Sequence, residues 1–324
     1  MIALKIPTLS VVVPLYNESG SLAPLFARLA PVLAALQRDG EIASSEIVFV
    51  DDGSRDGTYA EVAALNALDP TVKGLRFARN FGKEAAMAAG LRAAGGDTVV
   101  LMDGDLQHPP ELIPQFMAAW RGGAMMATAA RQSRATDPPL RRWLSRSFYR
   151  VFGSISEVKL TEGAGDYRLF DRRVVNAINQ LPERTRFMKG ITSWVGFKQV
   201  TIDFEPEERA VGSTSWSLLR LLKYAFDGLS SFSTLPLRIW SSIGLLVSLI
   251  SVVYGGWLTV RTVIFGIDVP GYASIMVATL FLSGIQLISL GVIGEYLGRV
   301  FTEVKDRPLY LVAETLGIDS EIKS

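Results

Sequence analysis

The stretch TVVLMDGDLQHPP, residues 98–110, is the part of the chain that decides the fold. Its first five residues predict a buried strand, and the two prolines predict that the chain turns away afterwards. Asp103 and Asp105 follow the strand, so two carboxylates reach the edge of a sheet. Carboxylate oxygens suit Mg²⁺ or Mn²⁺, and such an ion can neutralise a departing diphosphate. We therefore expect this edge to break a bond to a phosphate.

Similar strand ends occur upstream of this stretch. Strand patterns cover residues 9–14, 46–50, 72–77, 98–102 and 124–130, and helix patterns cover 21–37, 58–68 and 83–94. The alternating order predicts a mostly parallel sheet with helices on both faces, that is, an α/β fold. Ligands of such sheets bind at the carboxyl ends of the strands, where Asn17, Asp51, Asp52, Asp103 and Asp105 all fall. An isolated Asp-x-Asp pair is more often a turn or a helix cap, and this convergence is what favours a site.

Composition excludes several classes of function. The chain has 324 residues and a net charge of +1, from 33 basic and 32 acidic side chains, which argues against a nucleic-acid partner. It has no cysteine, so disulfides and thiolate metal sites are excluded. The only histidine, His108, is interpreted as a turn residue, so a histidine zinc site or a serine–histidine–aspartate triad is not expected.

Two uncharged apolar stretches predict transmembrane helices. Residues 239–260 and 269–294 contain no charged side chain, and a bilayer core needs roughly 20 apolar helical residues. The alternative is a pair of buried core helices. Arginines and lysines flank both stretches on their outer sides, which by the positive-inside rule places both ends of the pair in the cytoplasm. No signal-peptide pattern precedes residue 15, so we expect the N-terminal part to stay in the cytoplasm.

Two basic segments with interleaved aromatic residues are typical of membrane-surface helices. Residues 131–150 hold six arginines and one acid, and residues 216–226 form an amphipathic pattern before the first apolar stretch. The arginines could also grip a phosphate through their forked donors. The alternative for the first segment is a solvated charged face.

Eight ordered motifs carry a resemblance to a known family. They are VVVPLYNE (11–18), VDDGSRDG (50–57), RNFGKE (79–84), DGDLQHP (103–109), GDYRL (165–169), FMKG (187–190), SFSTLPLR (231–238) and GEYLGR (294–299). Together they resemble the inverting family 2 glycosyltransferases with a GT-A fold. Within that family the chain is most similar to polyprenyl-phosphate glycosyltransferases, and above all to the bactoprenol glucosyltransferases.

The resemblance implies a role for each matching position. The nucleotide sugar would be held by Pro14, Tyr16, Glu18, Asp51, Asp52, Lys83, Asp103 and Arg209. Mg²⁺ or Mn²⁺ would be held by Asp103, Asp105 and Gln107. The acceptor phosphate would be held by Arg131, Arg141 and Ser145. One position departs from the family pattern, because Ser215 stands where a lysine is common, and a phosphate contact from that lysine is not expected here.

The catalytic residues implied are Asp103, Asp105 and Asp166. Asp166 would act as the base or would orient the donor, and the alternative is a loop-fixing aspartate. Lys83 would contact the donor phosphate, and the alternative is a surface lysine at a helix start. The lipid phosphate is already ionised at neutral pH, so a strong general base is less necessary than for a hydroxyl acceptor.

The resemblance implies a membrane enzyme that transfers a sugar, most readily glucose from UDP-glucose, to polyprenyl (undecaprenyl) phosphate with inversion. GDP-mannose, UDP-N-acetylglucosamine and a modified arabinose remain alternative donors. A processive polysaccharide synthase and a non-catalytic nucleotide-binding membrane subunit are the alternative functions. Two helices cannot line an export pore alone, and a non-catalytic protein would tolerate loss of both Asp103 and Asp105.

The expected organisation has four parts. Residues 1–212 would form the cytoplasmic GT-A domain, 213–235 an interfacial amphipathic helix, 236–298 a two-helix transmembrane hairpin, and 299–324 a cytoplasmic C-terminal tail. The protein would be multi-pass in the bacterial inner (plasma) membrane with both termini cytoplasmic. We also expect a homo-oligomer.

Overall fold

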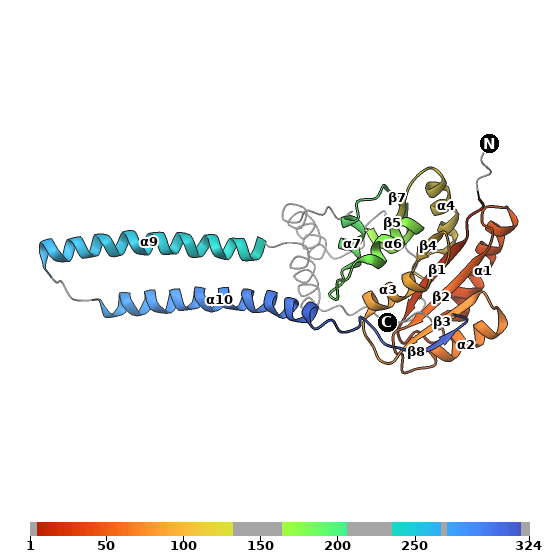
Figure 1. Ribbon diagram of the computed structural model, residues 1–324, viewed down its shortest axis with the longest axis horizontal. Helices are drawn as coiled ribbons and strands as arrows, with labels where there is room; N and C mark the ends of the chain where they lie inside the picture. Colours follow the sequence, from red (N-terminus) through yellow and green to blue (C-terminus); the bar gives the residue numbers. More distant parts are fainter. Residues whose placement is uncertain (1–4, 132–163, 206–234, 267–270, 319–324) are drawn as a thin grey trace.

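The computed structural model describes residues 5–131, 164–205, 235–266 and 271–318 (Figure 1). The strands are β1 Leu9–Leu15, β2 Ser45–Asp51, β3 Val72–Phe77, β4 Thr98–Leu101, β5 Met126–Arg131, β6 Ala164–Asp171, β7 Gln199–Phe204 and β8 Val312–Leu316. The α-helices are α1 Leu22–Arg38, α2 Thr58–Leu68, α3 Lys83–Ala93, α4 Ile113–Arg121, α6 Arg172–Gln180, α7 Met188–Trp194, α9 Leu235–Phe265 and α10 Tyr272–Val304. A short 3₁₀ turn, Pro110–Leu112, leads into α4.

The described strands form one mixed sheet in the order β7-β5-β6-β4-β1-β2-β3-β8. The central strands β4, β1, β2 and β3 are parallel, as their α-helical crossovers require. β6 runs antiparallel between β4 and β5, and β8 runs antiparallel along β3. The α/β fold with a mostly parallel sheet is therefore confirmed, with antiparallel strands added on both sides of the central four.

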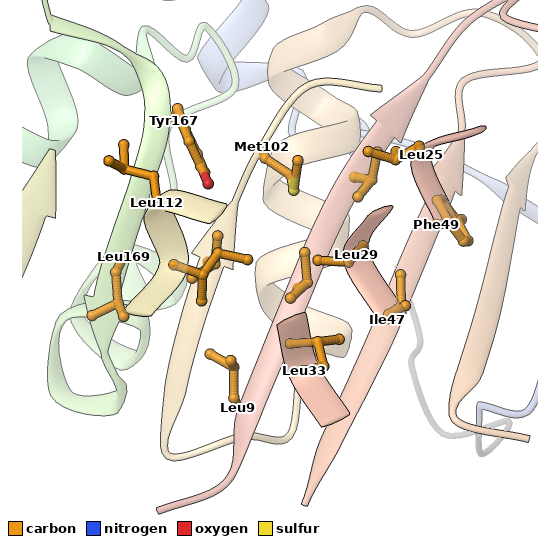
Figure 2. Close-up of a cluster of buried hydrophobic side chains, with 14 of the residues drawn as sticks. Leu9, Leu25, Leu29, Leu33, Ile47, Phe49, Met102, Leu112, Tyr167 and Leu169 are labelled. Atoms are coloured by element: carbon orange, nitrogen blue, oxygen red, sulfur yellow. The ribbon is translucent and has the colours of Figure 1, made fainter. Parts of the chain in front are cut away.

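Helices cover both faces of this sheet, and each face has its own core. The α1, α2 and α4 helices pack on one face, and α3, α6 and α7 pack on the other. In β1 the side chains alternate between the two cores, because Val11 and Val13 join the first and Val12 joins the second. Figure 2 shows the first core, where Leu25 and Leu29 of α1 lie over the strands.

Close packing of α3 on the sheet depends on a glycine. A Cβ atom at Gly90 would lie 2.2 Å from Val12 Cγ1, which is closer than non-bonded carbon atoms approach. The small-residue sequence of α3 therefore lets its backbone approach β1 directly. This approach places the first residue of the helix, Lys83, over the carboxyl ends of the strands.

The two long helices have the length and composition to cross a membrane. The apolar spans run over Ile239–Phe265 and Ser274–Val304, with mean hydropathies of 2.0 and 2.1. Leu245 and Val263 have exposed fractions of 74% and 80%, so these apolar faces are not buried in a protein core. Figure 1 shows α9 and α10 extending together away from the sheet domain. The two apolar helices anticipated from the sequence are present, and each is longer than its uncharged stretch.

The chain returns to the sheet after α10. Tyr310 is buried and stacks on Phe77 at a ring-centroid distance of 4.9 Å. β8 then pairs with β3, and Arg76 Nη1 donates to Glu314 Oε1 at 3.0 Å. This part of the segment predicted as a C-terminal tail thus contributes a strand to the edge of the sheet.

Candidate active site

The acidic turn after β4 is closed by bonds to its own residues. The Asp103 amide donates to Nδ1 of His108 at 3.0 Å, and the Gln107 amide donates to Oδ1 of Asp105 at 3.2 Å. Leu106 has a φ of 63°, which a non-glycine residue adopts only when its surroundings hold it there. The turn therefore presents Asp103 and Asp105 from a defined backbone.

Lys83 joins this turn to a carboxylate on another strand. Its ammonium lies 2.6 Å from Oδ1 of Asp103 and 2.8 Å from Oδ2 of Asp166, the third residue of β6. The side chains of the two aspartates are 25% and 20% exposed, so both are reachable from solvent. The structure thus brings together three of the residues singled out from the sequence.

These three charges control one another's ionisation. Burial alone would lower the pKa of Lys83, but Asp166 and Asp103 together raise it above the usual range of a lysine. Burial opposes ionisation of Asp166, yet Lys83 and then Lys189 hold the pKa of that carboxyl well below its usual range. At neutral pH Asp166 is therefore a carboxylate and a poor proton acceptor.

Asp52 fixes the loop that delivers Lys83. Its carboxylate accepts from the amides of Phe81 at 2.6 Å and Gly82 at 2.9 Å, and Gly82 has a φ of 100° that favours glycine. Burial raises the pKa of Asp52, although both amide bonds act against that shift. The bonds set where α3 begins, and so they place the ammonium of Lys83.

The turns after β1 and β2 bond to each other. The Asn17 amide donates to Oγ of Ser54 and the Arg55 amide donates to Oδ1 of Asn17, both at 2.9 Å. Gly53 has a φ of 68°, and a Cβ there would lie 2.4 Å from the Arg79 carbonyl carbon. Tyr16 stands 44% exposed at the end of β1, so its ring can stack on a planar group.

Asp51 and Glu18 complete this end of the sheet. Asp51 is fully buried, accepts from the Ser54 amide at 3.0 Å, and lies 3.5 Å from Nε of Arg76. A Cβ on Gly104 would lie 2.4 Å from Oε2 of Glu18, so the Glu18 carboxylate touches the acidic turn. The turns after β1, β2 and β4 therefore form one continuous surface.

Comparison with known proteins assigns this arrangement to a family. Residues 10–178 match the family described as Glycosyl transferase family 2, and residues 235–300 match the GtrB C-terminal hairpin. The chain belongs to glycosyl transferase family 2. An uncharacterized glycosyltransferase of Synechocystis is 48% identical over 311 residues and covers 96% of both chains. A prophage-derived bactoprenol glucosyl transferase of Shigella flexneri is 45% identical over 307 residues, 95% of this chain and 98% of the relative.

Among solved structures, a mannosyltransferase of Pyrobaculum calidifontis bound to GDP-mannose and Mn²⁺ is similar at a TM-score of 0.44. It is 14% identical, and the match covers 93% of this chain and 88% of that one.

The remaining predicted site residues of this glycosyltransferase are placed only in part. Arg131 is the last residue of β5. Arg141, Ser145 and Arg209 lie outside the described residues, as do residues 132–150 and 216–226 of the two basic segments. Pro14 is buried inside β1. The roles assigned to these residues stay predictions.

Sequence reasoning missed a carboxylate beside the site. Glu84 follows Lys83, and its Oε2 accepts from the Met188 amide at 2.8 Å, which ties the start of α7 to α3. Burial raises the pKa of Glu84 to about 7, and the charge of Asp166 adds to the shift. The RNFGKE motif contained this residue, but only the long-range contact to Met188 shows its role.

The oxygen donors in the acidic turn fit a divalent cation. Asp103, Asp105 and Gln107 offer two carboxylates and an amide oxygen within five residues. In the described ranges no three histidine or acidic side chains gather into a metal cage. Mg²⁺ commonly takes one or two carboxylates and completes its shell with substrate phosphates and water, so a cage is not required. The ammonium already bound to Asp103 also shows that this carboxylate faces a position suited to a cation.

Proposed function

We propose that this glycosyltransferase transfers a hexose, most readily glucose from UDP-glucose, to a polyprenyl phosphate at the membrane surface. The observation that carries the proposal is the convergence of Asp103, Lys83 and Asp166 beside the turns after β1 and β2. The match to the bactoprenol glucosyl transferase, which extends over the helical hairpin as well as the sheet domain, supports the substrate class.

The donor end of the site follows from the three turns. The exposed ring of Tyr16 can stack on the base, and the Glu18 carboxylate touches the acidic turn at Gly104. Asp103, Asp105 and Gln107 would hold Mg²⁺ or Mn²⁺, which supplies charge neutralisation on the diphosphate when bound. Lys83 lies close enough to the same turn to contact the donor phosphates.

The chemical step is a displacement with inversion. A phosphate oxygen of the lipid attacks the anomeric carbon, the bond from that carbon to the diphosphate breaks, and the nucleoside diphosphate leaves with the electron pair. Because the attacking phosphate is already ionised, no proton has to be removed. The depressed pKa of Asp166 agrees with this, since an ionised carboxylate can orient sugar hydroxyls but seldom takes up a proton.

The acceptor would approach from the bilayer. The exposed apolar faces of α9 and α10 support a membrane-spanning hairpin rather than a pair of core helices. Arg131, Arg141 and Ser145 would receive the lipid phosphate, with Arg131 at the end of β5 in the same sheet that carries Asp166.

The return of the chain to the sheet supports a cytoplasmic position for both ends of the hairpin. β7 precedes the two helices and β8 follows them, and both strands belong to the same sheet, which supports a hairpin with both ends on the side of the sheet domain. A donor such as UDP-glucose is cytosolic, and we infer that the sheet domain and both termini are cytoplasmic in the bacterial inner membrane.

The activity is tested with purified full-length protein, polyprenyl phosphate and radiolabelled UDP-glucose, UDP-N-acetylglucosamine or GDP-mannose. We expect a metal-dependent glycolipid, formed fastest from UDP-glucose, and at least about a hundredfold loss of rate in Asp105→Ala. Asp69→Ala, which changes a carboxylate at the end of α2, is the matched control. Unchanged turnover in Asp105→Ala would refute the catalytic assignment, and faster transfer from another donor would correct the sugar.

Membrane topology is tested separately by thiol labelling, which is possible because the chain has no native cysteine. Asp268→Cys places a thiol in the connection between the two helices, and Arg307→Cys places one after α10. In intact spheroplasts a membrane-impermeant maleimide should label the Asp268→Cys variant and not the Arg307→Cys variant. After lysis the reagent should label the Arg307→Cys variant as well. The opposite labelling pattern would rule out the proposed orientation.

A further inference from the structure

The only histidine of the chain lies under the acidic turn rather than in the open site. His108 is 5% exposed, and its ring stacks on Tyr167 with centroids 4.8 Å apart and planes inclined by 17°. Phe204 meets the same ring edge-on at 6.2 Å. These contacts bury the ring, so His108 is not placed to exchange protons with a substrate.

The polar edge of the ring contacts the backbone of Asp103. Nδ1 of His108 accepts the Asp103 amide at 3.0 Å, which requires an unprotonated Nδ1 and puts the ring proton on Nε2. The amide is that of the first aspartate in the turn, so the imidazole acts on the position of a carboxylate that binds Lys83.

Tyr167 extends this support to the other side of the site. Its hydroxyl donates to the carbonyl of Pro109 at 2.7 Å, so the His108–Tyr167 pair holds both ends of the turn. Tyr167 follows Asp166 in β6, and alternation along a strand sends these two side chains to opposite faces. The stack therefore links the strand that carries Asp166 to the turn that carries Asp103.

We propose that His108 is a positioning residue for the transfer reaction, which fixes the Asp103 backbone so that the turn's carboxylates face the donor diphosphate and its cation. This inference rests on the proposed function. The proposed role depends on the hydrogen-bond acceptor Nδ1, and not on the aromatic ring alone. Removing Nδ1 leaves the Asp103 amide without a hydrogen-bond partner, so the backbone of the turn can shift. Removing the ring mainly weakens the packing under the turn.

Two substitutions separate the effect of the hydrogen-bond acceptor Nδ1 from the effect of the aromatic ring. In His108→Asn the side-chain carbonyl oxygen is as many bonds from Cα as Nδ1 is, so it can still accept the Asp103 amide, but the stack on Tyr167 is lost. In His108→Phe the stack is preserved and the acceptor is removed. The proposal predicts that stability and ligand binding respond in opposite order to these two changes.

The experiment uses full-length protein in detergent micelles. Binding of Mn²⁺ alone is followed by electron paramagnetic resonance of the free ion, binding of UDP with Mn²⁺ by calorimetry, and unfolding of the ligand-free protein by thermal melting. We expect about tenfold weaker Mn²⁺ and UDP binding in His108→Phe, with a smaller fall in melting temperature than in His108→Asn. We expect His108→Asn to melt at a lower temperature while its binding stays within about threefold of the wild type.

The outcomes distinguish this inference from the function on which it rests. Wild-type affinity in His108→Phe, or an equal loss of binding in both variants, would overturn the positioning role while leaving the donor site intact. A wild-type protein that binds neither Mn²⁺ nor UDP would instead overturn the proposed function, and this inference with it.

Discussion

Removing the ammonium of Lys83 should tighten metal binding while it slows the reaction. This ammonium lies 2.6 Å from Oδ1 of Asp103, on the carboxylate that a divalent cation would use. In Lys83→Met the carboxylate is released from this pair. The same change removes the cation beside Asp166, so the pKa of that carboxyl rises toward its ordinary value and the site loses a charge facing the donor.

The magnitude follows from the geometry. Two unit charges about 4 Å apart interact by about 4 kcal/mol at the effective dielectric constant of a protein surface. The Lys83 side chain is 45% exposed, and solvent screening reduces this to about 1–2 kcal/mol. In the absence of nucleotide we therefore expect Lys83→Met to bind Mn²⁺ about tenfold more tightly than the wild type. Its kcat should fall by about tenfold to a hundredfold, because a charge that stabilises the departing diphosphate is gone.

Mn²⁺ affinity is measured by electron paramagnetic resonance on ligand-free protein, and kcat with saturating metal and donor. Lys189→Met is the matched control, because Lys189 acts on Asp166 but has no bond to Asp103. It should change kcat modestly and leave Mn²⁺ affinity as it is. Unchanged or weaker Mn²⁺ binding in Lys83→Met would refute the idea that the ammonium competes with the metal for Asp103.

Three further predictions concern the framework of the site. The pKa of Glu84 is about 7 in the folded protein, against 4.5 for an exposed glutamate. Between these two pH values the unfolded chain binds fewer protons than the folded protein, so the free energy of unfolding falls as the pH rises. Thermal melts at pH 5 and pH 8 should show a loss of about 1–3 kcal/mol that is absent in Glu84→Gln, and a pH-independent wild type would contradict this. Gly90→Ala should cost about 1–3 kcal/mol of unfolding free energy, because its Cβ would overlap Val12 Cγ1 at 2.2 Å, and a normal melting temperature would argue against the close packing. Glu314→Gln removes an exposed partner of Arg76 and should change UDP affinity by less than about threefold in calorimetry; a larger loss would mean that this ion pair itself sets the donor site.

The sequence predicted the central fold well because the signals there are local. Apolar periodicity and the turn residues between the patterns located residues 58–68 as a helix and 72–77 as a strand with the bounds that the structure has. The order of those patterns then required parallel pairing. Parallel pairing in turn predicted that Asp103 and the turns after β1 and β2 lie at the same edge of the sheet, because the carboxyl ends of parallel strands meet there.

What the sequence could not predict depends on partners far away in the chain. β8 is short and half exposed, and only its pairing with β3, across 238 residues at the Arg76–Glu314 contact, makes it a strand. His108 was predicted to be a turn residue, and its stack with Tyr167 from another strand has no local signal in the sequence. The two backbone amides that Asp52 accepts, from Phe81 and Gly82, are also not indicated by any local pattern, and its nucleotide role stays a prediction.

The pairing of β8 with β3 connects the end of the helical hairpin to the sheet edge beside the candidate site. Arg76 lies between the returning chain and the donor turns, because its guanidinium donates to Glu314 at 3.0 Å and lies 3.5 Å from the buried Asp51. Exposed ion pairs contribute at most about 1 kcal/mol, so the return segment is held mainly by the β3–β8 ladder and by the stack of Tyr310 on Phe77. The same segment covers the strand that carries Arg76. We therefore expect the residues after α10 to stabilise the turn after β2 through Arg76, and their removal to destabilise the sheet domain.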